Sequence, residues 1–285
     1  MALRSDLPKL SATGAGMINV TKENEINENK KYVSAEYLKR IAQHAAHIKK
    51  RTYELMDLQT DSIVLDIGCG PASDTIPLAE YIGSAGRIVG IDIDPEMIEK
   101  ANKELTLSGI QKDVSHIRAD VQSLPFPDSV FDICRAERLF QVLPRSISMA
   151  SVFFEIDRVL KPGGTIVLAD ADWGSATVNF SDMELERRLI NFFATGMRPN
   201  GFAGRQLFEL LQRNAYQDIN VDVVPFTARE LSETMFGEWL REEALKHEIA
   251  TLEEMDNWRA ELENKSSKGT FFACVNMVIV AGKKE

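Results

Sequence analysis

Two hydrophobic periodicities alternate along the middle of this chain. Runs rich in valine and isoleucine, typical of strands buried on both faces of a parallel sheet, occur at five places: residues 62–67, 87–92, 114–119, 131–135 and 165–170. Stretches with apolar residues at helical spacing lie between several of these runs: residues 72–82, 95–108 and 147–160. Strands that alternate with helices predict an α/β fold with a doubly wound, mostly parallel sheet.

The pattern changes after the fifth run. Residues 182–196 and 204–214 have helical spacing, residues 218–224 form a sixth apolar run, and a seventh lies at 270–281. Residues 226–269, between the last two runs, are strongly charged and mostly helical in pattern. We therefore expect two closing antiparallel strands, separated by a helical insertion, to complete a seven-stranded sheet.

The start of the chain differs from the rest. Residues 1–30 are rich in serine, glycine, asparagine, lysine and glutamate, a composition that predicts a flexible segment. Apolar residues at near-helical spacing in residues 35–58 predict cap helices that precede the sheet. Residues 31–285 are thus expected to form a single domain with these cap helices and the late insertion.

The composition and net charge of the chain limit the kinds of binding partner and location that we expect for it. The chain has 285 residues and a net charge of −10, which disfavours a nucleic-acid partner because an acidic surface repels phosphates. No apolar run approaches the roughly 18 residues of a membrane span, and we expect a cytoplasmic protein. The three cysteines lack the paired spacing of a metal site, so free thiols and no bound metal are expected.

The carboxyl ends of the strands carry the candidate chemistry, because ligands of open α/β sheets bind there. The first strand leads through Asp66 into Gly68 and Gly70, a pair of glycines that permits a tight turn and close approach of a ligand. Asp92, which is 22 residues after Gly70, ends the second strand and can accept hydrogen bonds from both hydroxyls of a ribose. The alternative is a helix cap, for which Asp94 is better placed.

The next strand end offers a second polar contact. Asp120 can accept a hydrogen bond from the exocyclic amine of an adenine, and Val121 can offer its backbone N–H and an apolar wall. The alternative for Asp120 is an ordinary polar residue of a turn. Together with the glycine turn and Asp92, these residues predict a nucleoside-containing cofactor.

Four motifs in order resemble class I S-adenosylmethionine-dependent methyltransferases. They are Val64-Leu65-Asp66-Ile67-Gly68-Cys69-Gly70-Pro71, Gly90-Ile91-Asp92-Ile93-Asp94-Pro95, Ala119-Asp120-Val121 with Leu124-Pro125-Phe126, and Arg158-Val159-Leu160-Lys161-Pro162-Gly163-Gly164. The third glycine of the dinucleotide fingerprint is absent, since Ser73 follows Ala72, which disfavours a nicotinamide enzyme. The resemblance implies a Rossmann-like methyltransferase fold and S-adenosylmethionine as cofactor.

The resemblance also implies roles for single residues. It places Asp66 at the methionine amino group, with Gly68 and Gly70 beside the methionine portion, Asp92 on the ribose and Ile93 against the adenine. The adenine amine and edge are assigned to Asp120 and Val121.

Two further cofactor contacts have alternatives. Arg135 would pair with the cofactor carboxylate, or else form a salt bridge with Glu137 or Asp132. Tyr32 would close over the cofactor, or else be an ordinary packing residue.

The implied function is transfer of a methyl group to an O, N or C atom of a small molecule, such as a secondary metabolite. Alternatives are a quinone-type C-methyltransferase and a non-catalytic S-adenosylmethionine-binding regulator. No catalytic residue is assigned, because Val142 stands where many relatives carry a histidine, and Glu137 and Asp172 are equally suited to structural roles. Aromatic and methionine residues could line an apolar substrate pocket under the insertion, or else form the helical core: Phe192, Phe193, Met197, Phe202, Met235, Phe236 and Trp239.

Overall fold

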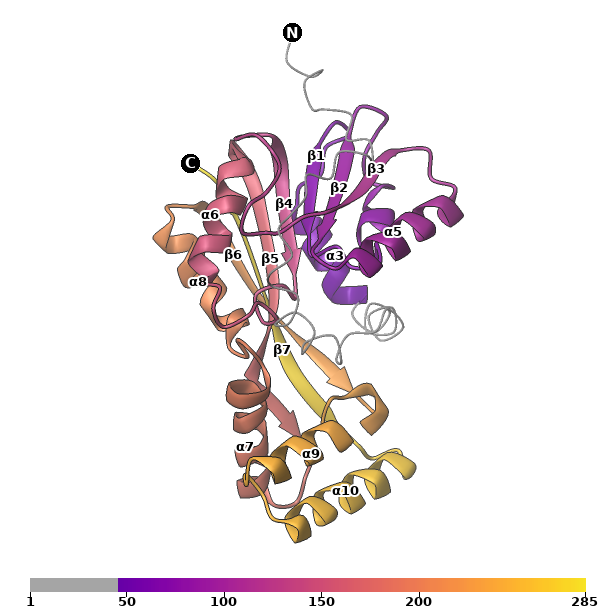
Figure 1. Cartoon of the computed structure of the whole chain (residues 1–285), viewed down its shortest axis with the longest axis vertical. Helices are drawn as coiled ribbons and strands as arrows, with labels where there is room; N and C mark the ends of the chain where they lie inside the picture. The colour runs from indigo at the N-terminus through magenta and orange to yellow at the C-terminus, as the bar shows by residue number, and fades with distance from the viewer. Residues whose placement is uncertain (1–45) are drawn as a thin grey trace.

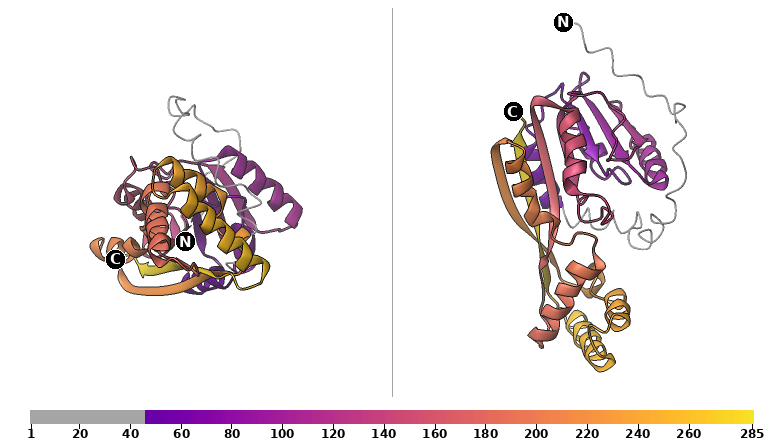
Figure 2. Two further views of the ribbon diagram at one scale, coloured as in Figure 1. Left: turned by 90° about the horizontal axis from the view of Figure 1, so that it is seen from below. Right: turned by 60° about the vertical axis from the view of Figure 1, so that its left-hand side comes forward.

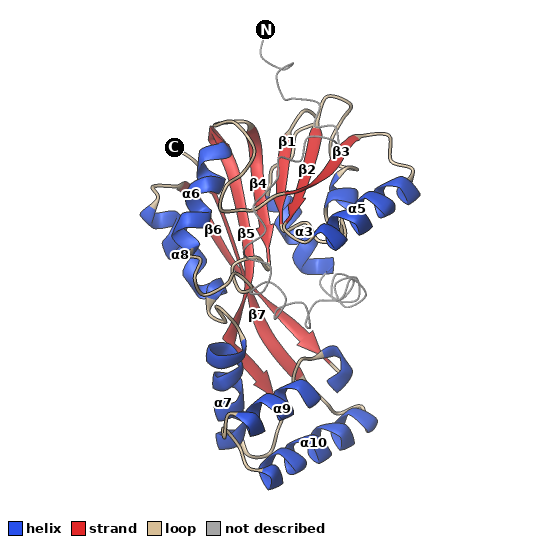
Figure 3. Ribbon diagram, in the orientation of Figure 1, coloured by secondary structure: helices blue, strands red, loops and turns tan. Residues whose placement is uncertain are grey.

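The structure is a computed structural model that describes residues 46–285. Within these residues, seven strands form one sheet (Figures 1 and 3): β1 Ile63–Ile67, β2 Arg87–Asp92, β3 Asp113–Arg118, β4 Phe131–Glu137, β5 Leu160–Val178, β6 Gln217–Ala228 and β7 Ala273–Lys283. The α-helices are α3 Ala46–Leu55, α4 Thr75–Leu78, α5 Pro95–Ser108, α6 Met149–Val159, α7 Met183–Phe192, α8 Ala203–Arg213, α9 Glu238–Lys246 and α10 Leu252–Ser267. The α/β class predicted from the hydrophobic pattern is confirmed.

The strand order defines where a ligand can bind. The order is β3-β2-β1-β4-β5-β7-β6, with β7 antiparallel to both of its neighbours and the other pairs parallel. The chain proceeds from β1 outward to β3 and then returns to the opposite side of β1 with β4. This reversal creates a crevice at the carboxyl ends of β1 and β4, the position at which doubly wound sheets bind their ligands.

Helices cover both faces of the sheet (Figures 2 and 3). One apolar cluster joins α6 and α8 to one face through Phe153, Ile156 and Leu207. The other face packs against α3 and α4 through Ile48 and Leu78. Adjacent side chains alternate between the two covered faces, which explains why Val64, Leu65 and Ile67 of β1 are all buried and apolar.

Three strands extend well beyond the others and build a second lobe (Figure 1). The far ends of β5, β6 and β7 carry α7, α9 and α10 there, around a core that includes Phe180 and Trp258. The prediction that the fifth strand ends at residue 170 is wrong, since β5 continues to Val178, opposite Ala273 of β7. Asp172 and Gly174 interrupt the apolar pattern in this stretch, and the pairing register shifts after Asp172.

The predicted helix at residues 72–82 is also wrong in length, since only Thr75–Leu78 is α-helical. Pro77 has no N–H to donate, and Gly70 and Ala72 adopt positive φ angles of 53° and 65°, so the start of the predicted helix is a turn. The insertion begins later than predicted, because β6 continues to Ala228.

Three predictions fall wholly or partly outside the described residues. Residues 1–30 and Tyr32 lie before the first of them, and only the Ala46–Leu55 part of the expected cap helices at 35–58 is described, as α3.

The second lobe generates a stability prediction. Trp258 is 1% exposed, its ring packs 4.7 Å from that of Phe180, and its indole N–H donates to the Phe236 carbonyl at 3.0 Å. Trp258→Ala should lower the free energy of unfolding by about 3–5 kcal/mol, because it leaves a large cavity and an unpaired carbonyl. Leu252→Ala, at a 58% exposed position of α10, is the control and should cost less than about 1 kcal/mol. Urea unfolding measures both, and a loss below 1 kcal/mol for Trp258→Ala would contradict this account of the lobe.

Candidate functional site

The turn after β1 is held against the end of β2. The backbone N–H groups of Gly68 and Cys69 both donate to the Ile91 carbonyl, at 2.8 and 2.9 Å. Gly68 and Gly70 have φ angles of 74° and 53°, in the left-handed region where a side chain is strained. The turn therefore presents bare backbone to the crevice beside β4, as the two glycines predicted.

Asp92, at the end of β2, is joined to this turn. One carboxylate oxygen accepts from the Gly70 N–H at 3.0 Å, and the other accepts from the Asp94 N–H at 2.9 Å. Burial raises the pKa of Asp92, while these backbone donors act in the opposite direction. Each oxygen retains acceptor capacity for a ligand hydroxyl. The helix cap is Asp94, which accepts from the Glu96 N–H at 2.9 Å, so the alternative of a cap at Asp92 is wrong.

The adenine side of the predicted site lies on the same pocket wall. Ile93 is apolar yet 43% exposed, and it faces the pocket together with Asp120 and Val121. The Asp120 carboxylate accepts from the Gln122 N–H at 2.9 Å, so this residue also has the turn role that was its alternative.

Arg135 is the centre of a buried ionic cluster. Its guanidinium donates to Asp66 at 2.8 Å, to Asp74 at 3.0 Å and to Glu137 at 2.5 Å. Lys49 of α3 also pairs with Asp74. The predicted alternative of a Glu137 salt bridge is therefore present, whereas Asp132 binds Lys161 instead, at 2.6 Å.

The cluster includes residues that the sequence analysis missed. Lys49 and Tyr53 reach Asp74 from α3, and the Tyr53 hydroxyl donates to Asp74 at 2.7 Å. Lys49 lies in the short basic run Lys49-Lys50-Arg51, a pattern typical of a solvated helix face, yet it is only 6% exposed. Only the tertiary packing of α3 over the turn reveals its partner.

Asp66 has an oxygen with unused capacity. Its Oδ1 binds Arg135, while Oδ2 is buried and receives no hydrogen bond within the described part of the chain. Burial raises the pKa of Asp66 to about 6, an effect that outweighs the opposing charge of Arg135. A cationic donor at this oxygen would satisfy it, and an amino-acid ammonium group has that chemistry.

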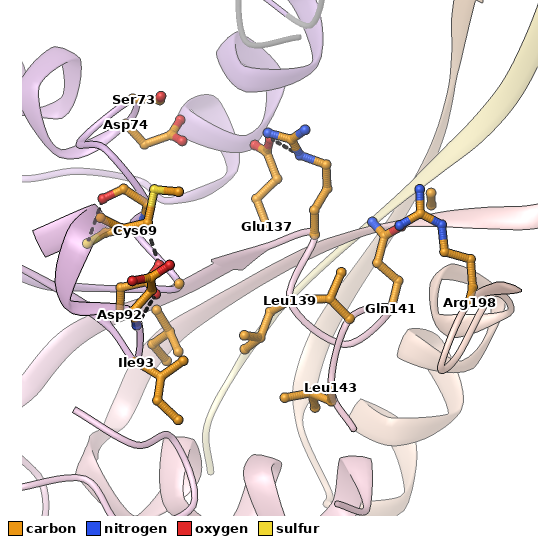
Figure 4. A pocket seen from close by; sticks show the side chains of 18 of the residues that line it. Cys69, Ser73, Asp74, Asp92, Ile93, Glu137, Leu139, Gln141, Leu143 and Arg198 are labelled. Carbon is orange, nitrogen blue, oxygen red and sulfur yellow. Dashed lines mark hydrogen bonds and ion pairs between the residues drawn. The ribbon is translucent and has the colours of Figure 1, made fainter. Parts of the chain in front are cut away.

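The glycine turn, the ends of β2 and β3, and Arg135 with Asp74 and Glu137 border one continuous pocket of about 680 Å³, a volume typical of small-molecule sites. Asp66, Lys49 and Tyr53 lie behind this lining. Figure 4 shows Asp92 and Ile93 at one end and Gln141 and Arg198 at the other, with Leu139 between them. The pocket therefore joins the predicted cofactor end to a second compartment formed by the loop after β4 and by the second lobe.

The loop after β4 is held by Asp170, a residue at the predicted end of the fifth strand. Its carboxylate accepts three backbone N–H bonds, from Phe140 at 2.8 Å, from Gln141 at 3.2 Å and from Ala171 at 3.0 Å. Burial raises the pKa of Asp170 to about 7, against the effect of these donors. The loop that lines the second compartment is thereby tied to β5.

The two candidate bases both have structural partners. Glu137 belongs to the ionic cluster, and Asp172 accepts both of its hydrogen bonds from the Arg205 Nε at 3.0 Å. Among the predicted apolar residues, Met235 and Phe236 line the pocket. Phe193 is fully buried and packs 5.4 Å from the Phe236 ring. The other members of that set are absent from the pocket wall: Phe192, Met197, Phe202 and Trp239.

Within residues 46–285, none of the helices has an apolar stretch of the length that a bilayer requires. The same residues contain no group of three or more histidine, cysteine or carboxylate side chains arranged to hold a metal ion. Cys69, Cys134 and Cys274 are free thiols.

The strand order, the glycine turn and the acidic strand ends define the class I methyltransferase fold. The family described as "Methyltransferase domain" matches residues 58–220, more than half of the chain, so the chain belongs to this family. This confirms the family predicted from the four motifs, whose cofactor is S-adenosylmethionine.

Relatives agree with this assignment. The demethylmenaquinone methyltransferase of Listeria monocytogenes is 31% identical over 154 residues, which are 53% of this chain and 63% of that protein. The YcgJ protein of Bacillus subtilis has a TM-score of 0.56 at 20% identity, covering 84% of this chain and 99% of its own. Geranyl diphosphate C-methyltransferase of Streptomyces coelicolor has a TM-score of 0.52 at 14% identity, covering 84% and 79%.

These two structures share the fold with this chain. The chain spans about half to two thirds of the length of the first curated relatives it matches.

The ionic cluster generates a second prediction. Arg135→Met should lower the free energy of unfolding by about 3–5 kcal/mol, because it leaves three buried carboxylates without their shared cation. Arg87→Met is the matched control, since the ion pair of Arg87 with Asp113 is partly exposed and worth at most about 1 kcal/mol. Equal losses for the two variants in urea unfolding would show that the cluster is no more stabilising than a surface pair.

Proposed function

We propose that this chain transfers a methyl group from S-adenosylmethionine to an O, N or C atom of a small molecule. The observation that carries the proposal is the single pocket, which joins the glycine turn and Asp92 to a largely apolar compartment. A donor cofactor and an acceptor can thus lie in contact within one pocket. When bound, the cofactor supplies a methyl group that is already activated by its sulfonium.

Residues at the first end have chemistry that fits the cofactor. Asp92 has free acceptor capacity for two ribose hydroxyls, and the positive-φ glycines leave room for the methionine portion. Asp66 offers a buried, unpaired oxygen to the ammonium group. Ile93 and Val121 provide apolar contacts for the adenine, with Asp120 near its amine.

The two remaining predicted cofactor contacts, Arg135 and Tyr32, are not proposed to bind the cofactor on the same grounds. The guanidinium of Arg135 is already engaged by the carboxylates of the ionic cluster. We therefore propose that Arg135 mainly positions Asp66 and Glu137 rather than binding the cofactor carboxylate. Tyr32 lies outside the described residues and stays a prediction.

The residues of the pocket suit alignment and exclusion of water rather than general base catalysis. Transfer from an activated donor requires an in-line approach, and orientation in a closed site can supply several kcal/mol of barrier reduction. The candidate bases Glu137 and Asp172 are both engaged in ion pairs. We therefore assign no catalytic residue, and propose that the acceptor presents a nucleophile that is reactive without one.

The acceptor is proposed to be a small apolar metabolite, because the second compartment is lined largely by carbon, with the helical segment at about 226–269 as its lid. A quinone-type acceptor is the second candidate, favoured by the similarity to a demethylmenaquinone methyltransferase. A cytoplasmic location and the lack of a nucleic-acid partner stay predictions from the sequence.

Cofactor binding is the first test. Asp92→Ala should weaken S-adenosylmethionine binding by about 1–3 kcal/mol, because hydrogen bonds to a charged acceptor are lost. Calorimetry compares this variant with Asp113→Ala, a control carboxylate at the start of β3 outside the pocket, which should bind like the unmodified chain. Unchanged affinity in Asp92→Ala would remove the ribose role, and selective binding of NAD by the unmodified chain would refute the proposed cofactor.

Turnover is the second test. Incubation with methyl-labelled S-adenosylmethionine and a small-molecule extract should label at least one metabolite. Cofactor binding without any labelled product would favour the alternative of a non-catalytic binding protein.

A further inference from the structure

The pocket end farthest from Asp92 contains a side-chain amide with unused donor capacity. It belongs to Gln141, in the loop after β4, which forms part of the pocket wall (Figure 4). Gln141 is 3% exposed, so its amide meets the pocket rather than open solvent. The wall around it is mainly carbon and includes Leu139, Ala171 and Phe236. A polar group in such surroundings requires a hydrogen-bond partner.

Trp173 determines which end of the Gln141 amide a ligand meets. The indole N–H of Trp173 donates to the Gln141 Oε1 at 2.6 Å. An indole nitrogen is a donor only, so the amide oxygen must face it and the NH₂ group must point away from it. Among residues 46–285, no atom accepts a hydrogen bond from the Gln141 Nε2. The amide therefore offers the pocket N–H donors and no acceptor.

Both residues of this hydrogen bond are held in place by their backbones. The Gln141 N–H donates to the Asp170 carboxylate at 3.2 Å. The Trp173 N–H donates to the Gly201 carbonyl at 2.8 Å, and the Trp173 ring packs 4.9 Å from that of Phe193. The donor is thus preorganised, and a ligand that accepts from it loses little free energy to the ordering of the side chain.

The partner that suits this amide is an oxygen that accepts without donating. A hydroxyl could accept from the Gln141 Nε2, but its own proton would find no acceptor on Gln141, whose oxygen is occupied by the indole. A buried O–H without a partner is costly, whereas a carbonyl oxygen has no proton to place. The hydrogen bond from Trp173 also polarises the amide, which strengthens its N–H donors in an apolar compartment.

We propose that the Gln141 Nε2 donates to a carbonyl oxygen of the methyl acceptor, and that Trp173 sets this preference by holding the amide oxygen. The acceptor is then an apolar carbonyl compound, with its carbonyl at the Gln141 end of the pocket and its body extending toward Asp92. Gln141 is a specificity-determining residue and Trp173 a positioning residue. This inference rests on the proposed function, since it names the substrate class of that reaction.

The first test compares matched ligands on the protein saturated with S-adenosylhomocysteine. One set is 2-acetylnaphthalene, 1-(2-naphthyl)ethanol and 2-ethylnaphthalene, and the other is 4-phenyl-2-butanone, 4-phenyl-2-butanol and butylbenzene. Equilibrium dialysis measures the six affinities. In at least one set the ketone should bind at least about fivefold more tightly than the alcohol, because the alcohol leaves its proton unpaired. Failure of both ketones to bind, or an alcohol as tight as its ketone in both sets, overturns the proposal.

Two variants locate the effect. Gln141→Met keeps the length of the side chain without its N–H groups, so it should weaken ketone binding roughly three- to tenfold and leave the hydrocarbon within about twofold. Trp173→Phe keeps an aromatic ring but removes the indole N–H, so the amide can present either end. Its preference for the ketone over the alcohol should fall to within about twofold, a change that lost packing alone would not produce.

The control is Gln212→Met, an exposed position of α8 outside the pocket, where all six affinities should be unchanged. Unchanged ketone affinity in Gln141→Met, or an unchanged preference in Trp173→Phe, overturns the proposal. If one of these two variants does not fold, the other and the unmodified chain still decide the outcome.

The readouts separate this inference from the proposed function. Gln141→Met should bind S-adenosylhomocysteine like the unmodified chain, because its side chain lies at the opposite end of the pocket from Asp92. If the unmodified chain does not bind S-adenosylhomocysteine, the proposed function fails, and the same dialysis without it still decides whether the pocket selects a carbonyl group.

Discussion

The ion cluster around Arg135 is the interaction on which the rest of the site depends. One guanidinium, 1% exposed, joins Asp66 at the end of β1 to Glu137 at the end of β4, across the point where the strand order reverses. Its third partner, Asp74, belongs to the turn after the glycines, and Lys49 attaches α3 to that same carboxylate. Four separate segments are therefore bound together at the mouth of the crevice.

Such a cluster is a costly way to gain stability, because every charge must leave water. It does, however, specify geometry strongly, since each carboxylate must find a donor in a low-dielectric environment. The cluster does not satisfy every buried atom, since one carboxylate oxygen of Asp66 accepts no hydrogen bond from any described residue. Under the proposed function, that oxygen would accept a hydrogen bond from the cofactor ammonium group. The same ion cluster would then support both the local fold and the proposed cofactor end of the pocket.

The second lobe determines the other half of the pocket. Because β5 and β7 stay paired beyond the end of β4, they carry the insertion residues Met235 and Phe236 to the wall of the pocket. Trp173 lies on this extended part of β5, where it orients Gln141 and stacks against Arg198. A single tryptophan thus links the sheet, the loop after β4 and the second lobe.

The sequence by itself determined the order of strands and helices, the family, and the residues at the strand ends. These are local signals, since apolar periodicity, paired glycines and a carboxylate at a set distance are all read within short stretches. Only the tertiary structure decided the partners of Arg135, the length of β5, and the hydrogen bond between Trp173 and Gln141. Ion pairs, strand pairing and aromatic stacking connect residues distant in the chain, and no local pattern encodes such contacts. Gln141 and Trp173 are 32 residues apart, and their hydrogen bond exists because β4 and β5 are neighbours in the sheet.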